Sequence, residues 1–381
     1  MSSNGAILRT ATEDYLAGFG ENTGYLDYGR VGPLSAAVAA EQEAAVDVLV
    51  RAPGGTLHEL FRHDARVREA VAALVRVPAE QVVFQPNTST GLVHTFFGAS
   101  GAVLLSAAEF PSLPFAAVRA GQALGAVEPR WLRTDQGRVT PETVREQLTD
   151  EVTTVAVSLV DSRTGYLADV AAIREVIGER MLVLDAIQGC GVVDAPYELA
   201  DVVVTGGQKW LRAGWGTGFL ALSERALSRL TPVLSGWSAS EQAEPWDEVA
   251  PPRGDARAFS ISSPDPIAQA RLAAALEEVA AVGLPTIAGL VAERVSAIVD
   301  LADEFGLAVV GSRNERERAG IVVVEPEPQE LAPLAASLEA HGVTARLRPS
   351  TVRFSAHAGT TDETLALLRA ALVSAATSME Y

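Results

Sequence analysis

Short apolar runs alternate with amphipathic, helix-like stretches along most of the chain. The apolar runs are residues 82–84, 102–105, 155–160, 181–184, 202–204 and 218–222. Ahead of them, the spacing of apolar residues predicts helices over residues 34–50 and 57–75. Alternation of this kind predicts a largely parallel sheet with helices on both faces. Such sheets bind ligands at the carboxyl ends of their strands.

The last part of the chain mixes the two kinds of pattern. An irregular, proline-containing stretch covers residues 235–258, and helices are predicted from about Ser260 to Val282 and over residues 285–305. Short strands and further helices are predicted at residues 307–310, 321–324, 329–341, 344–347, 352–355 and 361–376. A chain of 381 residues is too long for one simple core. We therefore expect a large domain of residues 15–255 and a small α+β domain of residues 256–381, with residues 1–14 packing near the small domain.

Composition narrows the possible partners and locations. The formal net charge is −18, with 20% charged and 48% hydrophobic residues. Because so acidic a chain lacks the basic face that nucleic acid or an anionic membrane requires, we expect neither partner. The single cysteine, Cys190, excludes an internal disulfide and a Cys-rich metal site, and we expect no metal. With no apolar run of membrane-spanning length and no signal-peptide pattern, a cytoplasmic location is the simplest expectation.

Lysine is the residue type that departs most from this composition. It occurs once, at Lys209, and the other 29 of the 30 basic residues are arginine. Composition bias explains why lysine is scarce, but it does not explain why the remaining one lies in a glycine-rich turn between two apolar runs. Lysine, unlike arginine, can lose its proton and act as a nucleophile. We therefore predict that Lys209 forms a Schiff base with pyridoxal phosphate (PLP).

Polar and aromatic residues follow the predicted strands at the edge where this lysine is expected. Asn87, Thr88 and Ser89 open a helix directly after a strand, where backbone N–H groups and the helix dipole favour a phosphate. Asn87 or Thr88 would also serve simply as a helix cap. Phe110 follows the next strand and could lie flat on a planar cofactor ring, although an isolated aromatic residue at such a position is more often part of the core.

Charged and amide side chains follow other strands. Asp185 comes after a buried run, so it needs a cation such as a protonated pyridine nitrogen, unless it only caps a helix. Gln188 is three residues further on and can donate to a phenolate oxygen. Arg353 lies on a strand and has the planar fork that suits a carboxylate, with a surface ion pair as the alternative. Arg30 and Arg163 lie on turns, where they could contact an acidic substrate or only the solvent.

Taken together, these motifs resemble the aminotransferase class V group of fold type I PLP enzymes, which includes cysteine desulfurases, kynureninases and isopenicillin-epimerase-like proteins. The resemblance covers essentially the whole chain. Its most specific part is Asp185-x-x-Gln188 followed by Gln208-Lys209-Trp210. The resemblance implies an α/β fold, a mainly parallel seven-stranded sheet in the large domain, a small α+β C-terminal domain, and a homodimer with active sites at the interface.

The resemblance also implies residue roles. The cofactor contacts that it implies are Thr88 and Ser89 at the phosphate, Phe110 on the ring, Asp161 and Gln188 near the phenolate oxygen, Asp185 at the pyridine nitrogen and Lys209 as the covalent attachment. Ser263 corresponds to a segment that reaches the phosphate in a neighbouring subunit. Arg353, in Arg-Phe-Ser-Ala-His, matches the arginine that grips the substrate carboxylate. Asp161 stands where the family typically has asparagine.

Three departures from the family pattern bear on the chemistry. Desulfurases carry a histidine over the ring, where this chain has Phe110. They also carry a nucleophilic cysteine shortly before the carboxylate arginine, and no cysteine precedes Arg353 in that region, so persulfide chemistry is not expected. The usual serine and histidine before the lysine appear as Gly206 and Gln208, which leaves Thr205 and Gln208 as phosphate donors.

The number of proton-transferring groups separates the possible reactions. In each of them the substrate amine displaces Lys209, which then acts as the base at Cα. Epimerisation generally needs bases on both faces, and Phe110 cannot supply the second; transamination and β-elimination need only one. Because the layout is most similar to ergothioneine-pathway carbon–sulfur lyases and isopenicillin-epimerase-like proteins, we expect a carbon–sulfur β-lyase of secondary metabolism acting on an S-substituted cysteine. The open alternatives are an aminotransferase, a decarboxylating or oxidatively deaminating enzyme, an epimerase, and a PLP-binding sensor without turnover.

Overall fold

The larger part of the protein is built around one sheet of seven strands. The computed structural model describes residues 11–379 except 53, 56 and 243–245. The strand order is β1-β7-β6-β5-β4-β2-β3. The strands are β1 (Val82–Phe84), β2 (Gly101–Ser106), β3 (Val127–Leu132), β4 (Val152–Ser158), β5 (Met181–Asp185), β6 (Val202–Gly206) and β7 (Gly218–Leu222). Neighbours from β3 to β6 are parallel, and β7 runs antiparallel to both β6 and β1. The predicted α/β fold with a mainly parallel seven-stranded sheet is confirmed.

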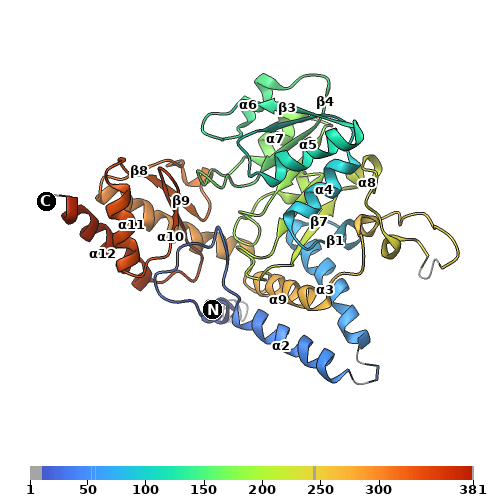
Figure 1. Ribbon diagram of the computed structural model, residues 1–381, viewed down its shortest axis with the longest axis horizontal. Helices are drawn as coiled ribbons and strands as arrows, with labels where there is room; N and C mark the ends of the chain where they lie inside the picture. Colours follow the sequence, from blue (N-terminus) through green and yellow to red (C-terminus); the bar gives the residue numbers. More distant parts are fainter. Residues whose placement is uncertain (1–10, 53, 56, 243–245, 380–381) are drawn as a thin grey trace, which may run out of the picture.

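Both faces of this sheet are buried, which explains why its strands are continuous apolar runs. Along β6, Val202 and Val204 pack in one cluster with Phe96, whereas Val203 packs in another cluster with Leu272. Helices cover both faces (Figure 1). Those that contribute to the first cluster include α4 (Thr88–Gly98), α5 (Ser112–Leu124) and α8 (Glu224–Arg229). Those that contribute to the second include α3 (Leu57–Val75), α6 (Pro141–Gln147), α7 (Val170–Ile177) and α9 (Pro266–Val282).

Strand β3 has no counterpart among the predicted runs. It lies at the edge of the sheet and pairs only with β2, so half of its side chains face solvent and the run is not apolar. Pro129 lies within it, and proline is tolerated in a strand at such an edge because it cannot donate a ladder hydrogen bond. An edge strand of this kind carries too weak a pattern for prediction from sequence.

The C-terminal part forms a second, antiparallel sheet of order β10-β11-β9-β8. Its strands are β8 (Ala308–Val309), β9 (Ile321–Glu325), β10 (Arg346–Leu347) and β11 (Val352–Ser355). The helices of this part are α10 (Leu284–Glu304), α11 (Leu331–Ala340) and α12 (Asp362–Met379). These elements form the lobe drawn in orange and red in Figure 1. The strands and helices predicted for this part of the sequence are all present, with boundaries shifted by a few residues.

Helix α9 does not lie with the small sheet, although the sequence division places it there. It packs along α2 (Ala36–Arg51) and α3, on the side of the large sheet (Figure 1). The division at residues 255 and 256 stays a prediction. Of residues 1–14, the first ten lie outside the described residues, and Ala11 and Asp14 lie beside α2 and α9. In the described part of the chain no single helix is long and apolar enough to cross a membrane; α9 and α10 together meet that test of length and composition, but across a bend of 86°.

Candidate functional site

Lys209 lies in the loop that joins β6 to β7. The base of the loop is closed by the Gly207 N–H, which donates to the Thr217 carbonyl at 2.8 Å. From the N-terminal segment, the Gly32 N–H donates to the Gln208 carbonyl at 2.8 Å. A Cβ atom on Gly32 would lie 2.0 Å from the Lys209 carbonyl oxygen, so only glycine permits this approach. The lysine backbone is therefore held from both sides.

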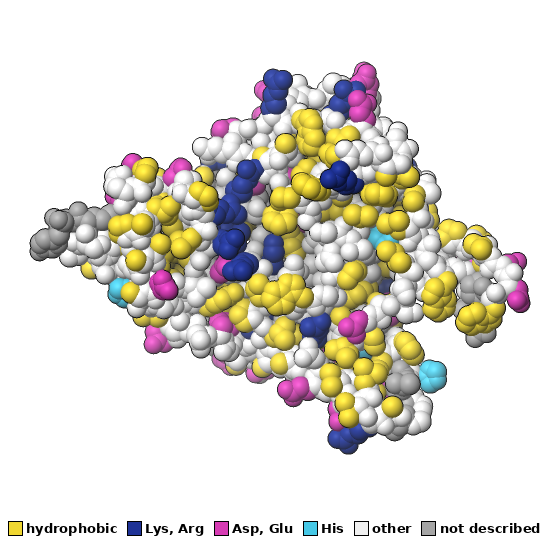
Figure 2. Space-filling view, viewed as in Figure 1, with side chains coloured by type: hydrophobic (Ala, Val, Ile, Leu, Met, Phe, Trp, Pro, Cys, Tyr) yellow, Lys and Arg dark blue, Asp and Glu magenta, His cyan; other side chains and the backbone are white. Residues whose placement is uncertain are grey.

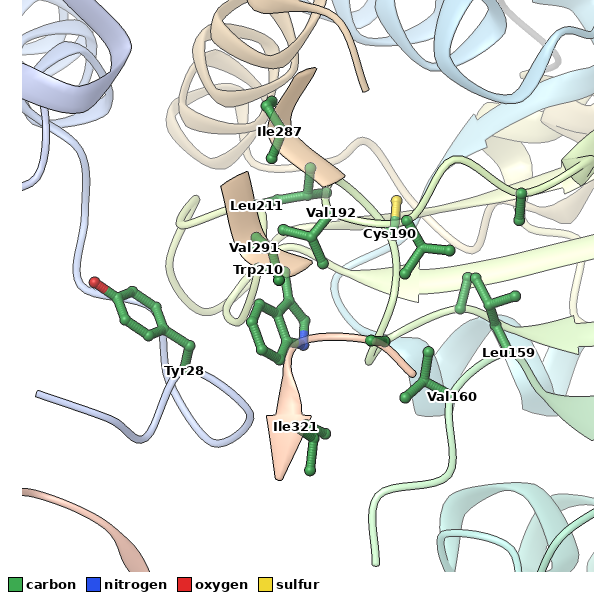
Figure 3. Packing of buried hydrophobic residues seen from close by; sticks show 14 of the residues in the cluster. Tyr28, Leu159, Val160, Cys190, Val192, Trp210, Leu211, Ile287, Val291 and Ile321 are labelled. Atoms are coloured by element: carbon green, nitrogen blue, oxygen red, sulfur yellow. The ribbon is translucent and has the colours of Figure 1, made fainter. Parts of the chain in front are cut away.

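Trp210 anchors the same loop in the core. Its indole stacks on Tyr28, with ring centroids 6.3 Å apart, and its Nε1 donates to Gln188 at 2.9 Å. Figure 3 shows the indole among side chains from several elements, with Tyr28 and Ile321 near it. His357 lies 3.0 Å from the Trp210 carbonyl, and burial lowers the pKa of His357 to about 3. This histidine is therefore neutral, and its contact with the Trp210 carbonyl holds the backbone next to Lys209.

Three of the predicted side chains meet beyond the ends of β2, β5 and β6. The Lys209 Nζ lies 5.4 Å from the centroid of the Phe110 ring. Burial lowers the pKa of Lys209 to about 8; the charge of Asp185 opposes that shift and Arg353 adds to it. Burial raises the pKa of Asp185 to about 6, against a hydrogen bond from the Ile187 N–H and the charge of Lys209. The amine is thus close to losing its proton at neutral pH.

Asp185 carries an unsatisfied oxygen. Its Oδ1 accepts a hydrogen bond from the Ile187 N–H at 3.1 Å, whereas Oδ2 is buried and has no hydrogen-bond partner among the described residues. A buried carboxylate oxygen without a donor costs free energy, so a cationic donor is needed there. The protonated ring nitrogen of PLP is such a donor, and an aspartate at this position suits it.

A second unsatisfied group lies where a phosphate would bind. The Thr88 Oγ1 is buried and has no partner within the described part of the chain. A Cβ atom on Gly206 would lie 3.2 Å from this hydroxyl and 2.4 Å from the Gln208 Oε1, so the missing side chain leaves a small cradle between them. Ser89 and Ser112, at the first turns of α4 and α5, lie 2.8 Å apart through their hydroxyls. Helix N-termini offer free N–H groups to anions, so Thr88, Ser89 and Gln208 would hold the phosphate.

Gln188 and Asp161 have partners within the protein. The Gln188 amide donates to the Gly29 carbonyl at 2.9 Å and accepts from Trp210, which leaves the second hydrogen of its NH₂ group for the predicted phenolate contact. Asp161 accepts through Oδ1 from the N–H groups of residues 163–164 and from a threonine hydroxyl, so it stabilises its own turn. The role of Asp161 beside the phenolate stays a prediction.

Three more residues from the sequence prediction lie as follows. Asn87 caps α4, accepting from the Thr90 N–H at 2.9 Å. Thr205 is fully buried and its hydroxyl donates to the Gly206 carbonyl at 3.3 Å, an orientation that gives no support to its predicted phosphate contact. Ser263 is exposed just before α9, and its predicted contact with a neighbouring subunit stays a prediction.

Arg353 forms a buried ion pair that the sequence prediction missed. Its Nη2 lies 3.2 Å from Asp27 Oδ1, both side chains are 5% exposed, and its Nη1 donates to the Ser162 carbonyl at 3.3 Å. The Nε is buried and has no partner in the described part of the chain, so a donor remains for a carboxylate. Arg30 is exposed, and its charge is one of those that lower the pKa of Asp27 against the larger effect of burial. The signal for Asp27 was a carboxylate inside the apolar run Tyr-Leu-Asp-Tyr.

Glu109 is a second residue whose role the sequence prediction missed. It is buried next to Phe110 and accepts hydrogen bonds from the backbone N–H and the hydroxyl of Ser158. Burial raises the pKa of Glu109 to about 7, and the charges of Asp161 and Asp185 raise it further, against the two hydrogen bonds. The ionised form of this side chain is therefore costly in the folded protein.

Replacing Glu109 with glutamine should stabilise the cofactor-free protein above pH 7. The pKa of Glu109 is about 7 in the folded protein and 4.5 ordinarily, so between these two pH values the folded state binds more protons than the unfolded state. The free energy of unfolding therefore falls as pH rises through this range. The expected gain at pH 8 is on the order of 2–3 kcal/mol and shrinks toward pH 5. Urea unfolding at both pH values measures it, with exposed Glu293→Gln on α10 as the control. Equal or lower stability of Glu109→Gln at pH 8 would contradict this account.

Comparison with known proteins places this geometry in a family. A sequence model described as aminotransferase class-V matches residues 51–380. A kynureninase from Deinococcus radiodurans is 30% identical over 280 residues, which cover 68% of this chain and 64% of the kynureninase, so the chain spans somewhat less than two thirds of that relative's length. An uncharacterized aminotransferase, YcbU, from Bacillus subtilis is 25% identical, over 78% of this chain and 79% of its own.

Solved structures share the fold. A mutant of C-DES with glycine covalently linked to its PLP cofactor matches with a TM-score of 0.83 at 18% identity, over 92% of this chain and 96% of that one. The fold, the unsatisfied Asp185 and Thr88 atoms, and the buried amine of Lys209 all suit this cofactor. Because the family model covers most of the sequence, the chain belongs to the aminotransferase class-V family of PLP-dependent enzymes and has the architecture of fold type I.

Proposed function

We propose that the protein is a carbon–sulfur β-lyase that cleaves an S-substituted cysteine. The observation that carries this proposal is the pairing of one buried amine, Lys209, with an aromatic face, Phe110, that cannot move a proton. β-Elimination needs a single base, provided that the leaving group departs readily, as a thiolate does. The Cα proton and the Cβ–S bond are lost, and after hydrolysis by one water the products are a thiol, pyruvate and ammonia.

The residues of the site divide this task among them. PLP, when bound, draws electrons from the substrate Cα and makes its proton acidic. Lys209, with a pKa near 8, can take that proton and later supply it to the departing sulfur. Asp185 keeps a negative charge at the ring nitrogen. Arg353 offers its unpaired Nε to the substrate carboxylate and so orients the Cα–H bond toward the lysine.

The related proteins support a lyase without fixing its substrate. One solved structure with a TM-score of 0.82, at 19% identity, is that of the cystine C–S lyase C-DES with its product cysteine persulfide. A probable cysteine desulfurase of Aeropyrum pernix is 27% identical, over 73% of this chain and 72% of its own. Desulfurase chemistry needs a reactive thiol, and Cys190, the single cysteine of the sequence, is buried with its pKa raised to about 12.

An aminotransferase is the second candidate. Transamination also uses one amine to move one proton, and the Bacillus subtilis relative is named an aminotransferase. The contacts of Lys209 and Asp185 serve both reactions equally. What separates them is whether the Cβ substituent leaves.

A substrate panel separates these functions. The holoenzyme is incubated with S-substituted L-cysteines, and pyruvate and free thiol are measured in parallel; the lyase predicts equal amounts of both. Accumulated pyridoxamine phosphate with no thiol would indicate an aminotransferase. Loss of optical rotation without products would indicate an epimerase, and a lasting spectral change without turnover a sensor. A separate assay that follows the consumption of L-kynurenine by its own ultraviolet absorbance tests the activity named for the Deinococcus relative.

A further inference from the structure

Basic side chains gather at the junction of the two sheets. Figure 2 shows Lys and Arg side chains in one stripe between the lobe that contains α11 and α12 and the lobe of the large sheet. A chain with a net charge of −18 does not produce such a concentration by composition. Five arginines here share a hydrogen-bond acceptor or act on the pKa of a common neighbour, and we call them the arginine cluster: Arg30, Arg163, Arg346, Arg348 and Arg353.

Strand register puts three members of the cluster on one face. Arg346 in β10 lies directly opposite Arg353 in β11, and residues opposite one another in an antiparallel pair point to the same side. Arg348 lies just past the end of β10 and reaches the same side, because it and Arg353 donate to one carbonyl oxygen, that of Ser162. Like charges directly opposite are destabilising, so the fold keeps these cations together at a cost.

The cluster surrounds the turn at the rim of the lysine site. Arg348 donates to the Ser162 carbonyl at 3.1 Å, and Arg353 donates to the same oxygen at 3.3 Å. Arg163, the next residue of that turn, donates to the Ala108 carbonyl, two positions before the phenylalanine that faces Lys209. Arg163 is exposed and Arg348 is half-buried, whereas Arg353 is buried, so Arg163 and Arg348 lie nearer to the solvent than Arg353 does.

Carboxylates within the chain do not balance this charge. Asp27 pairs with Arg353, and the charge of Asp161 acts on Arg348 without a salt bridge between the two. Among the described residues, Arg30, Arg163, Arg346 and Arg348 have no carboxylate oxygen within the 4.0 Å of a salt bridge. Two carboxylates therefore face five cations, which leaves a surplus of positive charge in the arginine cluster.

We propose that the substrate carries a second carboxylate at the far end of its side chain, bound by Arg348 and Arg163 while Arg353 holds the α-carboxylate. Guanidinium forks bind carboxylates through two parallel hydrogen bonds, which would fix the side chain at its outer end. The inference rests on the proposed function for the part of the substrate that reacts, namely its cysteine-derived amino-acid end. For a carbon–sulfur lyase it selects cysteine conjugates whose S-substituent is itself an acid.

A matched pair of substrates tests the proposal. S-Carboxymethyl-L-cysteine and S-carbamoylmethyl-L-cysteine have the same shape, but only the first has the second charge. The expected kcat/KM is at least about tenfold higher for the acid, since a charge-assisted hydrogen bond is worth that much. The ratio of the two values should fall toward one in Arg348→Met and in Arg163→Met, and Arg348→Lys should keep part of it. Arg145→Met, an exposed arginine on α6, should keep the full ratio.

A binding measurement separates this inference from the proposed reaction. Calorimetry of the holoenzyme compares glutarate with its monoamide, and we expect glutarate to bind at least about tenfold more tightly, with the difference lost in Arg348→Met. If neither cysteine conjugate is cleaved but glutarate keeps its advantage, the proposed reaction is wrong and the arginine cluster is a carboxylate site. If both conjugates are cleaved with equal kcat/KM and glutarate binds no more tightly than its monoamide, the proposed lyase reaction is retained and the inference of a second carboxylate site is overturned.

Discussion

Replacing Lys209 with alanine is expected to lower kcat/KM by at least about a thousandfold and to remove the visible absorbance of lysine-bound cofactor. The physical reason is that one amine serves both as the covalent attachment and as the base, and no other lysine occurs in the sequence. Turnover of an accepted substrate measures the first effect. Borohydride reduction followed by intact-mass spectrometry measures the second, because the parent enzyme should retain the cofactor's mass and the variant should not.

Because Lys209 is the single lysine of the sequence, no other lysine can form the adduct in these variants. Lys209→Arg keeps a positive charge beside Asp185 but cannot attack a carbonyl, so it should lose as much activity as the alanine variant. A melting temperature close to that of the parent would show that the loss is chemical. A borohydride-stable adduct in either variant would contradict the assignment of Lys209.

Replacing Asp185 with asparagine is expected to lower kcat by about a hundredfold or more, because a neutral amide no longer holds a positive charge at the cofactor ring nitrogen. The same change should lower the pKa of Lys209, since the charge of Asp185 opposes the effect of burial on that amine. In the cofactor-free protein, the pH dependence of acylation of the single lysine reports this pKa directly.

Asp300→Asn, at an exposed position on α10, is the matched control and should change neither kcat nor the pKa of Lys209. An unchanged kcat in Asp185→Asn would remove the ring-nitrogen role from Asp185. An unchanged lysine pKa combined with a lower kcat would place Asp185 at the cofactor but not in electrostatic contact with the amine.

Much of the fold follows from local pattern. The six apolar runs and the helices between them are present because strands buried on both faces must be apolar along their whole length. The edge strand β3 was not predicted because part of it faces solvent, which permits arginine, glutamate and proline in its sequence. The position of α9 against α2 and α3 was not predicted either, because the apolar face of a helix does not indicate which neighbouring element it packs against.

The sequence by itself determined the chemistry of the centre. One lysine among arginines, an aspartate after a buried strand and hydroxyls at a helix start are local signals, and parallel strands necessarily bring their carboxyl ends to one edge. Only the tertiary structure decided the partners of the outer residues. Asp27 with Arg353 and Glu109 with Ser158 join segments that are 326 and 49 residues apart. Contacts between segments so far apart in the sequence depend on how the layers and lobes pack against one another, and the local sequence pattern does not indicate this packing.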